Sequence, residues 1–378
     1  MKVIFGTDAI KYPLTGIGRY AYELAKCLSH SSDISELCYL HAQKLTKKLP
    51  VARESSLSAD GIKEYLKKNR LASEIYRISA PWLKTNVLRK HKDAIYHGPN
   101  FYLPPGVDNC VVTFHDLSVF TLPHCHPPER VRYMQKELLQ TIKRAEIIIS
   151  DSDFTRNELI NYFNLSDKKV FTAKLACSDK FRPAKQEVIE PILSKLNLKY
   201  KQYALFMGSI EPRKNISTLL DAYERIPLKR RQQTPLVISG FKGWRSEDLH
   251  YRFEKCEREG WLRYLGFTAS SDLPALYSGA VSFLFPSLYE GFGLPVLEAM
   301  SSGTPVVCSD SSSLPEVAGP GALMCDAMDV ETLTNLIIKS LDDDAWRLHA
   351  VKLGKIHASQ FSWERCAAET IAAYKQVR

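Results

Sequence analysis

The sequence lacks the long hydrophobic runs and the cysteine patterns that mark membrane-spanning and disulfide-stabilised proteins. Nowhere in its 378 residues do about 18 uncharged apolar residues follow one another, so we expect no membrane-spanning helix. An acidic residue, Asp8, occurs too early for a secretory signal peptide. The nine cysteines are scattered without a Cys-x-x-Cys pair, which argues against a disulfide framework and a zinc ribbon. These absences predict a soluble, cytoplasmic protein.

Composition and patterning indicate an α/β protein. Hydrophobic residues make up 45% and charged residues 25% of the chain, which excludes wholesale disorder and collagen-like repeats. Short apolar runs alternate with helical patterns, and this alternation predicts parallel sheets built from βα units. The expected strands are Lys2–Thr7, Ala94–His97, Cys110–His115, Glu146–Ser150, Ala204–Met207, Leu236–Ser239, Arg263–Leu265, Ser282–Phe285, Pro305–Cys308 and Ala322–Cys325.

The length favours two domains at about 150 residues each. A polar stretch, Lys180–Lys201, separates two halves with similar strand patterns. We therefore predict doubly wound α/β domains over residues 1–185 and 186–360, followed by a last helical segment over 361–378. Two such domains leave a cleft, and ligands of open α/β sheets bind at the carboxyl ends of the strands.

The net charge of +9 is concentrated in one window. Residues 44–92 hold thirteen Lys and Arg against four acidic residues, so this window alone carries the whole net charge. A basic segment of this kind attracts an anionic phospholipid surface or a nucleic acid. A solvated helix face has the same composition. We favour a membrane surface over a nucleic acid and keep the solvated face as the alternative.

The most informative segment is Pro286–Met300, which reads Pro-Ser-Leu-Tyr-Glu-Gly-Phe-Gly-Leu-Pro-Val-Leu-Glu-Ala-Met. It follows an expected buried strand, and Pro295 suits the first turn of a helix, where its missing N–H costs nothing. The turn before it therefore presents free backbone N–H groups at a helix N-terminus, and such groups bind anions. These amides belong to Phe292, Gly293 and Leu294.

Two carboxylates flank this predicted anion site. Glu290 lies in the turn, and Glu298 lies in the following helix. A carboxylate repels a phosphate, so we expect both side chains to accept hydrogen bonds from hydroxyl groups. A phosphate site flanked by hydroxyl acceptors describes a sugar nucleotide.

Three further segments offer binding residues. Arg213 and Lys214 follow an expected strand end, where cations reach a diphosphate. Gly16 belongs to Thr15–Ala21, which formally matches a dinucleotide fingerprint but lies too far from the first strand. We interpret it as a flexible loop that closes over a ligand. His115 ends an expected buried strand, a position typical of a ligand contact.

Together these residues resemble glycosyltransferase family 4, whose members are retaining enzymes of the GT-B fold. The resemblance covers nearly the whole chain and is most specific at Glu290, Glu298 and the Gly-Thr-Pro-Val-Val that follows. It implies that Glu290 contacts the donor sugar and Glu298 the ribose. It implies also that Arg213 and Lys214 hold the diphosphate.

The same resemblance implies that Gly16 approaches the diphosphate and that His115 touches the transferred sugar. The base is expected at two loops, through Gly240, Phe267 and Thr268. The first domain, 1–185, is expected to lie on the acceptor side, and the second, 186–360, to bind the nucleotide sugar. The last segment is expected to cross back onto the first domain. Many members carry an arginine where this sequence has Ser209, and Arg213 is expected to replace it.

The start of the chain, Gly-Thr-Asp-Ala-Ile and later Thr-Gly-Ile-Gly-Arg-Tyr, looks most similar to mannosyltransferases that build bacterial surface polysaccharide. This implies an α-mannosyltransferase that uses GDP-mannose and extends a polyprenyl-diphosphate-linked oligosaccharide of O-antigen or lipopolysaccharide. Residues 44–92 would then hold it on the cytoplasmic face of the inner membrane. A UDP-sugar donor and a sugar-nucleotide epimerase of the same architecture remain the alternatives.

Neither of two short clusters makes a convincing metal site. His124-Cys125-His126 lacks a fourth ligand nearby. Asp151-Ser152-Asp153 has the Asp-x-Asp pattern of metal clamps in other nucleotide-sugar enzymes, but a helix follows, and Ser152, Asp153 or Thr155 would cap it. We therefore expect metal-independent chemistry without a cofactor, the sugar nucleotide being a substrate.

Overall fold

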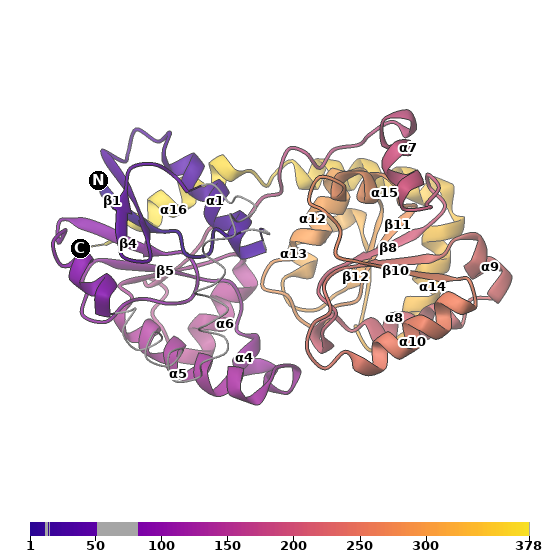
Figure 1. The fold of residues 1–378 in the computed structure, drawn as a ribbon, viewed down its shortest axis with the longest axis horizontal. Coiled ribbons are helices and arrows are strands. Elements are labelled where there is room, and N and C mark those ends of the chain that lie inside the picture. Colours follow the sequence, from indigo (N-terminus) through magenta and orange to yellow (C-terminus); the bar gives the residue numbers. More distant parts are fainter. Residues whose placement is uncertain (12–13, 15, 51–81, 378) are drawn as a thin grey trace, which may run out of the picture. The chain divides into compact units, whose positions relative to one another are not determined.

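The computed structural model describes residues 1–11, 14, 16–50 and 82–377. These residues form two compact units (Figure 1). The first unit consists of Met1–Leu117, Arg132–Leu175 and Trp363–Arg378, and the second consists of Ser118–Val131 and Ala176–Ser362.

The division differs from the sequence-based boundaries in two places. The chain enters the second unit at Ala176, before the boundary expected at 185–186. Ser118–Val131, expected in the first domain, belongs to the second unit. The reason is a set of contacts with Trp244, whose Nε1 donates to the Cys125 carbonyl at 2.6 Å and whose ring lies 4.9 Å from the Arg130 guanidinium.

The first unit contains a seven-stranded sheet in the order β3-β2-β1-β4-β5-β6-β7. All neighbouring strands are parallel except the β2–β3 pair. The strands are β1 (Lys2–Gly6), β2 (Glu36–His41), β3 (Lys44–Thr46), β4 (Ala94–Gly98), β5 (Cys110–Phe114), β6 (Ile147–Ser150) and β7 (Val170–Thr172). The helices are α1 (Gly16–Leu28), most of α5 (Pro128–Arg144), α6 (Asp153–Phe163) and α16 (Trp363–Tyr374), and residues 82–88 are also helical.

The second unit contains a six-stranded parallel sheet in the order β10-β9-β8-β11-β12-β13. The strands are β8 (Ala204–Met207), β9 (Leu236–Ser239), β10 (Leu262–Gly266), β11 (Ser282–Phe285), β12 (Val306–Ser309) and β13 (Leu323–Cys325). Its helices are α4 (Ser118–Thr121), α7 (Gln186–Lys195), α8 (Ile216–Glu224), α9 (Leu228–Gln233), α10 (Glu247–Arg258), α11 (Leu273–Gly279), α12 (Leu294–Ser301), α13 (Leu314–Ala318), α14 (Val330–Asp342) and α15 (Asp344–Ala358). Three short 3₁₀ turns, η1 (Pro123–Cys125), η2 (Pro212–Lys214) and η3 (Gly319–Gly321), complete it.

Both sheets have central strands that are buried along their whole length. Every residue of β5, β6, β8, β9, β11 and β12 is buried. This is typical of parallel sheets covered by helices on both faces, and it explains why continuous apolar runs predicted these strands. The strand order β10-β9-β8-β11-β12-β13 is the doubly wound arrangement of a dinucleotide-binding domain.

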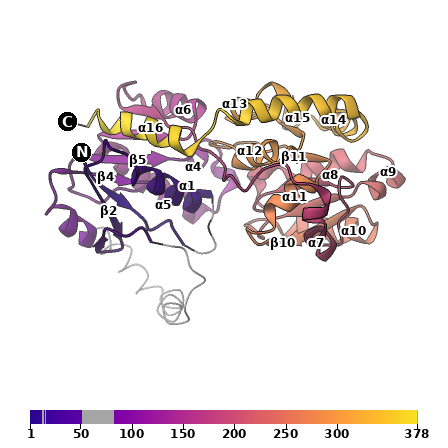
Figure 2. The same ribbon diagram turned by 90° about the horizontal axis from the view of Figure 1, so that it is seen from above.

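The last helix, α16, packs on the first unit, against α1, β6 and β7 (Figures 1 and 2). Its Tyr374 hydroxyl lies 2.7 Å from Nδ1 of His97, and Nε2 of the same ring lies 2.8 Å from Thr113 Oγ1. Thr113 Oγ1 in turn lies 2.7 Å from the Tyr20 hydroxyl on α1. Burial lowers the pKa of His97 to about 3, so the ring is neutral and needs one donor and one acceptor partner.

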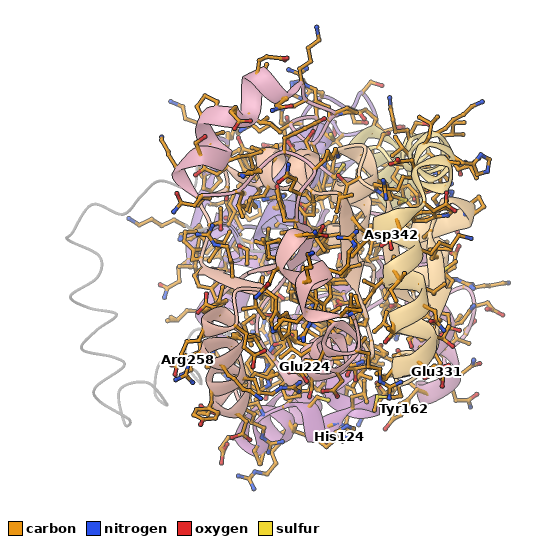
Figure 3. All side chains as sticks on the ribbon, turned by 90° about the vertical axis from the view of Figure 1, so that its right-hand side faces the viewer. His124, Tyr162, Glu224, Arg258, Glu331 and Asp342 are labelled. Atoms are coloured by element: carbon orange, nitrogen blue, oxygen red, sulfur yellow. The ribbon has the colours of Figure 1, made fainter. Side chains whose placement is uncertain are left out.

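We expect Tyr374→Phe to lower the free energy of unfolding by about 1–3 kcal/mol, because Nδ1 of the buried His97 ring loses its partner. Urea unfolding measures this difference. Tyr162→Phe on α6 is the matched control, and Tyr162 is labelled in Figure 3. Its side chain is 53% exposed, so we expect a change in the free energy of unfolding below about 0.5 kcal/mol. Equal stability of the two variants would contradict the structural role of this hydrogen bond.

Candidate active site

Two motifs of the second unit meet at the carboxyl ends of β8 and β11. These strands are neighbours, but the chain continues from β8 to β9 on one side and from β11 to β12 on the other. Ligands of open α/β sheets bind outside the strand ends at such a reversal. Arg213 and Lys214 follow β8, and Glu290 follows β11, so the topology brings both predicted groups to this point.

The turn after β11 is held in one conformation by local constraints. Gly293 precedes α12 with a φ of 113°, a conformation that other residues rarely adopt. A Cβ at this position would lie 2.9 Å from Leu314 Cδ2. Ser313 Oγ lies 2.7 Å from the Phe292 carbonyl and 2.9 Å from the Glu290 carbonyl. Pro295 lies within the first two positions of α12, as the sequence predicts.

The amide groups before α12 are available to a ligand. Within the described part of the chain, the N–H groups of Phe292, Gly293 and Leu294 have no hydrogen-bond acceptor. They lie at the N-terminus of α12, where unsatisfied N–H groups favour an anion. The geometry is therefore compatible with the predicted phosphate site.

Glu290 is bound by both of the predicted cations. Lys214 Nζ lies 2.6 Å from Glu290 Oε1, and Arg213 Nη1 lies 2.8 Å from Glu290 Oε2. Arg213 also donates from Nη1 to the Tyr289 carbonyl at 2.7 Å and from Nη2 to Glu211 Oε1 at 2.9 Å. Two cations and two carboxylates thus form a compact cluster of four side chains, which we call the charge cluster: Glu211, Arg213, Lys214 and Glu290.

The charge cluster is buried, and burial makes the pairing obligatory. Glu211 is 3%, Lys214 7% and Glu290 7% exposed. Burial alone would raise the pKa of Glu290, but the adjacent Arg213 and Lys214 outweigh it and lower this pKa to about 2. Burial lowers the pKa of Lys214, against the opposing effect of Glu290. An isolated charge at this depth would be strongly destabilising, so each ion depends on its partners.

Glu298 and the predicted base-binding residues are also ordered within the second unit. Glu298 on α12 is 6% exposed, and its Oε2 accepts a hydrogen bond from the Tyr277 hydroxyl at 2.9 Å. The Gly240 amide donates to the Gly266 carbonyl at 2.8 Å, which joins the loops after β9 and β10. Thr268 Oγ1 lies 2.8 Å from Ser239 Oγ and ties the same two loops together.

The profile of the family described as "Glycosyl transferases group 1" matches residues 189–356. Over 379 aligned residues the chain is 47% identical to the O-antigen chain mannosyltransferase B of Escherichia coli, covering 99% of this chain and 100% of that protein. The chain belongs to the group 1 glycosyltransferases. It is also 32% identical, over 66% of its length, to the serotype-specific mannosyltransferase WbdA of Escherichia coli, of which it spans 31%.

Among solved structures, the crystal structure of WaaG, a glycosyltransferase involved in lipopolysaccharide biosynthesis, is similar with a TM-score of 0.71 over 98% of both chains at 14% identity. At such a low sequence identity, this structural similarity shows a shared fold and nothing about function. The predicted family and the predicted GT-B fold with two Rossmann-like domains are confirmed. The chain is a hexosyltransferase of this family.

His115 of this glycosyltransferase has both ring nitrogens engaged within the first unit. Nδ1 lies 2.7 Å from Asp151 Oδ2, and Nε2 lies 2.9 Å from the Pro99 carbonyl. Burial lowers the pKa of His115, but the Asp151 carboxylate outweighs this and raises it above its ordinary value. The ring has no nitrogen left for a sugar hydroxyl, so its predicted contact with the transferred sugar stays a prediction that only a carbon or backbone atom can fulfil.

Gly16 corrects an expectation about local structure. The sequence predicts a flexible loop over Thr15–Ala21, but helix α1 begins at Gly16. The buried residues on α1, namely Gly18, Tyr20, Ala21, Leu24, Ala25 and Leu28, follow a helical period. The segment packs through this apolar face, and Gly16 therefore lies at a helix N-terminus. Its predicted approach to the diphosphate stays a prediction.

The Asp151-Ser152-Asp153 segment begins a helix. The Ser152 side chain accepts a hydrogen bond from the Thr155 amide at the N-terminus of α6, so the predicted cap is confirmed. Asp151 binds His115, and Asp153 pairs with Lys174 Nζ at 2.9 Å.

In the described ranges no helix has both the length and the hydropathy that crossing a bilayer requires.

Three residues of this site were not predicted from the sequence. Glu211 precedes Arg213 by two positions, and a carboxylate so close to a predicted phosphate ligand was a usable signal. Phe241 lies on the loop after β9, and its ring stacks on that of Phe267 with centroids 4.5 Å apart. Tyr277 gave no signal, because only the fold brings α11 beside α12.

The Glu290 pairing predicts a specific acid dependence of stability. Glu290 stays ionised in the folded protein to about pH 2, whereas in the unfolded chain it takes up a proton near its ordinary pKa of 4.5. The stabilisation that the Glu290 ion pairs contribute to the free energy of unfolding is therefore complete above pH 4.5 and is lost as the pH falls toward 2. We expect the difference in unfolding free energy between wild type and Glu290→Gln to shrink by ~3 kcal/mol over this interval.

Chemical unfolding at a series of pH values measures this dependence. Glu254→Gln on the exposed face of α10 is the control and should leave the acid dependence unchanged. A constant difference between wild type and Glu290→Gln from pH 5 to pH 2 would contradict the pairing.

Proposed function

We propose that this protein transfers mannose from GDP-mannose to a lipid-linked saccharide and retains the anomeric configuration. It is a mannosyltransferase of O-antigen biosynthesis, because it matches the O-antigen chain mannosyltransferase B over the full length of both chains at 47% identity. The observation that carries the proposed chemistry is the buried charge cluster, which lies beside free amides at the switch point of the second sheet.

The cluster suits a diphosphate that exchanges with a carboxylate. Arg213 and Lys214 are already paired with Glu211 and Glu290, so the cluster carries no net charge. A donor diphosphate must therefore take these cations from Glu290. As the glycosidic bond breaks, charge accumulates on the leaving diphosphate, and pre-positioned cations and amides stabilise it most at that stage.

Release from the cations changes what Glu290 can do. The carboxylate then lies beside the donor with its hydrogen-bond capacity unused, and hydroxyl groups of the transferred sugar are the partners that fit. Glu298 keeps the role of ribose ligand, and Tyr277 Oη orients it from 2.9 Å. Gly16 and His115 are proposed to approach the diphosphate and the sugar from the first domain.

Retention is proposed from the resemblance to the retaining glycosyltransferases, and the placement of the two glutamates bears on how it is achieved. Hydrolytic glycosidases use two carboxylates on opposite sides of the scissile bond. Here Glu290 and Glu298 come from one short segment, and Glu298 is assigned to the ribose. We therefore favour attack from the same face as the leaving group, with a donor phosphate oxygen accepting the proton of the acceptor hydroxyl. No metal ion is required in this scheme.

The base is proposed to bind at the loops after β9 and β10. Phe267 is 47% and Phe241 50% exposed, and their rings stack on each other. Exposed aromatic faces stack on nucleobases, and the two-ring guanine offers more stacking area than uracil. Gly240 lets the loop after β9 pack directly against the backbone after β8, because a Cβ at this position would lie only 1.8 Å from the Gly208 carbonyl oxygen.

Membrane association is the second part of the proposal. The basic window 44–92 would hold the protein on the anionic cytoplasmic face of the inner membrane, where a polyprenyl-linked acceptor resides. Residues 51–81 of this window lie outside the described residues. Co-sedimentation with liposomes tests it, and binding that ignores both anionic lipid content and salt would contradict it.

A donor panel tests the proposed substrate. We expect GDP-mannose to raise the melting temperature more than UDP-sugars and to be turned over with the saccharide acceptor in the presence of EDTA. Preference for a UDP-sugar would support the first alternative donor class. Formation of an epimer without any acceptor would support the epimerase, and loss of transfer in EDTA would contradict metal-independent chemistry.

The role of Glu290 is tested by separating turnover from donor affinity. We expect Glu290→Ala to lower kcat by about 10²–10³, the loss typical of one transition-state contact. Donor affinity should be unchanged or higher, because the diphosphate no longer competes with a carboxylate. Glu254→Ala, on the exposed face of α10, should match wild type. Near-normal kcat in Glu290→Ala would show that the carboxylate does not contact the reacting sugar.

A further inference from the structure

Two buried histidines of the first unit have different kinds of hydrogen-bond partner. The partners of His97 are two hydroxyl groups, which can each donate or accept a hydrogen bond. The partners of His115 are the Asp151 carboxylate at 2.7 Å and the Pro99 carbonyl at 2.9 Å. A carbonyl and an ionised carboxylate only accept hydrogen bonds. A neutral ring therefore satisfies the first set of partners, whereas the second set requires a donor at each ring nitrogen.

The first sheet brings His115 and Asp151 together. Strands β5 and β6 are parallel neighbours, and their last residues, Phe114 and Ser150, are in register. His115 and Asp151 are the next residues along the chain, so they meet at the carboxyl ends of two inner strands, the edge at which parallel sheets bind ligands. We call these two side chains the histidine–aspartate pair.

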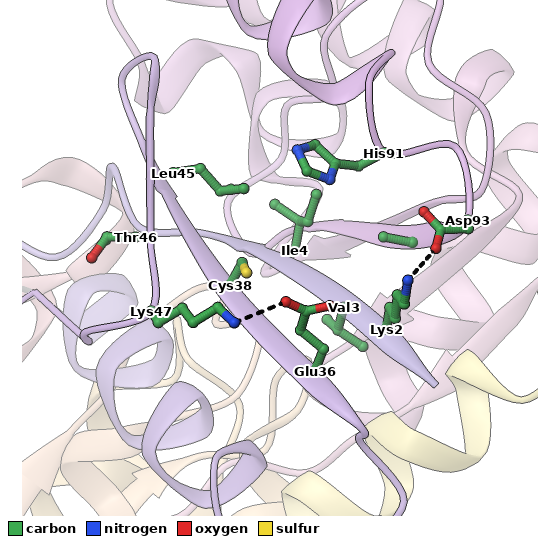
Figure 4. A pocket seen from close by; sticks show the side chains of 11 residues that line it. Lys2, Val3, Ile4, Glu36, Cys38, Leu45, Thr46, Lys47, His91 and Asp93 are labelled. Atoms are coloured by element: carbon green, nitrogen blue, oxygen red, sulfur yellow. Dashed lines mark hydrogen bonds and ion pairs between the residues drawn. The ribbon is translucent and has the colours of Figure 1, made fainter.

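Burial distinguishes this pair from ion pairs at the other edge of the same sheet. Figure 4 shows a hollow of about 290 Å³ at the amino-terminal ends of β1, β2 and β4, with the pairs Lys2–Asp93 at 2.5 Å and Lys47–Glu36 at 3.2 Å. Their side chains are between 40% and 78% exposed, and such pairs add little to stability. The side chains of the histidine–aspartate pair are only 8% and 3% exposed, so a charge on one of them depends on the other.

The titratable groups around the pair favour a positive charge on the histidine ring. Tyr20 on α1 and Cys366 on α16 are buried, and burial raises the pKa of each well above its ordinary value. Burial lowers the pKa of His97 on β4 to about 3. These three groups are therefore neutral near pH 7. The half-buried Asp116 carboxylate acts in the same direction as Asp151, because it raises the pKa of His115.

Two arrangements of protons satisfy the hydrogen bonds of the pair. In the ionic arrangement the ring donates from Nδ1 to Asp151 Oδ2 and from Nε2 to the Pro99 carbonyl. In the neutral arrangement the carboxyl group keeps the proton that lies between it and Nδ1. Burial raises the pKa of Asp151, but a carboxyl group starts from 3.8 and an imidazole from 6.5. Within the described part of the chain, Asp151 Oδ1 is buried without a hydrogen-bond partner, so no second donor competes with His115 for the carboxylate. Both observations favour the ionic arrangement.

We propose that Asp151 is a positioning residue that keeps His115 doubly protonated, so that the ring acts on the donor as a cation. A ring with a proton on each nitrogen cannot accept the proton of the acceptor hydroxyl, so His115 is not the general base. The positive charge is in place before the donor binds, and it stabilises the negative charge that accumulates as the glycosidic bond breaks. The effect on transfer rests on the proposed function, whereas the charge of the ring does not.

Histidine NMR tests the charge of the ring without turnover. With isotope-labelled histidine, we expect wild type to show protons on both ring nitrogens of His115 at pH 7. Asp151→Asn should show a single proton, because the asparagine amide can donate to Nδ1 of a neutral ring. His115→Asn assigns the signal, and the neutral ring of His97 is the internal reference. A neutral His115 in wild type would overturn the proposal, and so would an unchanged charge in Asp151→Asn.

The second test follows kcat against pH. We expect Asp151→Asn to lower kcat at about pH 7.5 by about 10- to 100-fold, less than the loss of a whole transition-state contact, and to leave the donor KM unchanged. The ratio of wild-type to variant kcat should shrink as the pH falls to about 5.5, because the buried ring of the variant takes up its proton only at lower pH. A change in the shape of the site alone would not produce this dependence.

Asp153→Asn is the matched control for both measurements. This carboxylate lies in the same segment and pairs with Lys174, but its side chain is 56% exposed, and kcat should match wild type at every pH. A ratio for Asp151→Asn that stays constant with pH would overturn the proposal. The kinetic test uses whichever sugar nucleotide is turned over. If none is, the proposed function fails while the NMR result still decides the charge of His115.

Discussion

The pairing of Glu290 with Arg213 and Lys214 is the interaction on which the site depends. All three side chains are buried or nearly so, and buried ions are tolerated only when their charges are matched. The surrounding structure serves this match. Gly293 permits the turn after β11, and Ser313 holds two of its carbonyls. Glu211 completes the neutrality by holding the second nitrogen of the Arg213 guanidinium.

Topology explains why polar groups collect at two places in the molecule. A doubly wound sheet reverses its strand order once, and at that point two adjacent loops diverge, so that backbone and side chains of both face one space. In the second sheet this point lies between β8 and β11, and in the first it lies between β1 and β4. The second place holds the paired charges of Arg213, Lys214 and Glu290, and the first holds the ion pair of Lys84 with Asp8.

The sequence predicted what short-range patterns control. Buried strands such as Ala204–Met207 and Ser282–Phe285 were predicted with their observed bounds, because parallel central strands need continuous apolar runs. The strands Glu36–His41, Lys44–Thr46 and Val170–Thr172 were missed. Lys44–Thr46 and Val170–Thr172 are three-residue edge strands, and Glu36–His41 is buried only in its middle three residues. Glycines and Pro295 revealed the turn before α12. The ion-pair partners of the site residues could not be predicted. Glu290 meets Lys214, and His115 meets Asp151, only because the fold brings together residues that are far apart in the sequence.

Neutrality of the charge cluster links recognition of the two ends of the donor. A diphosphate that takes Arg213 and Lys214 leaves the Glu290 carboxylate buried without its counter-ions, and that state is costly. A sugar hydroxyl supplies the missing hydrogen bonds, whereas a nucleoside diphosphate without sugar cannot. In the proposed reaction, the intact donor therefore completes the site and the product does not. Once the sugar has left, the return of Glu290 to its cations favours release of the diphosphate, so the same ion pair that organises the empty site also promotes product departure.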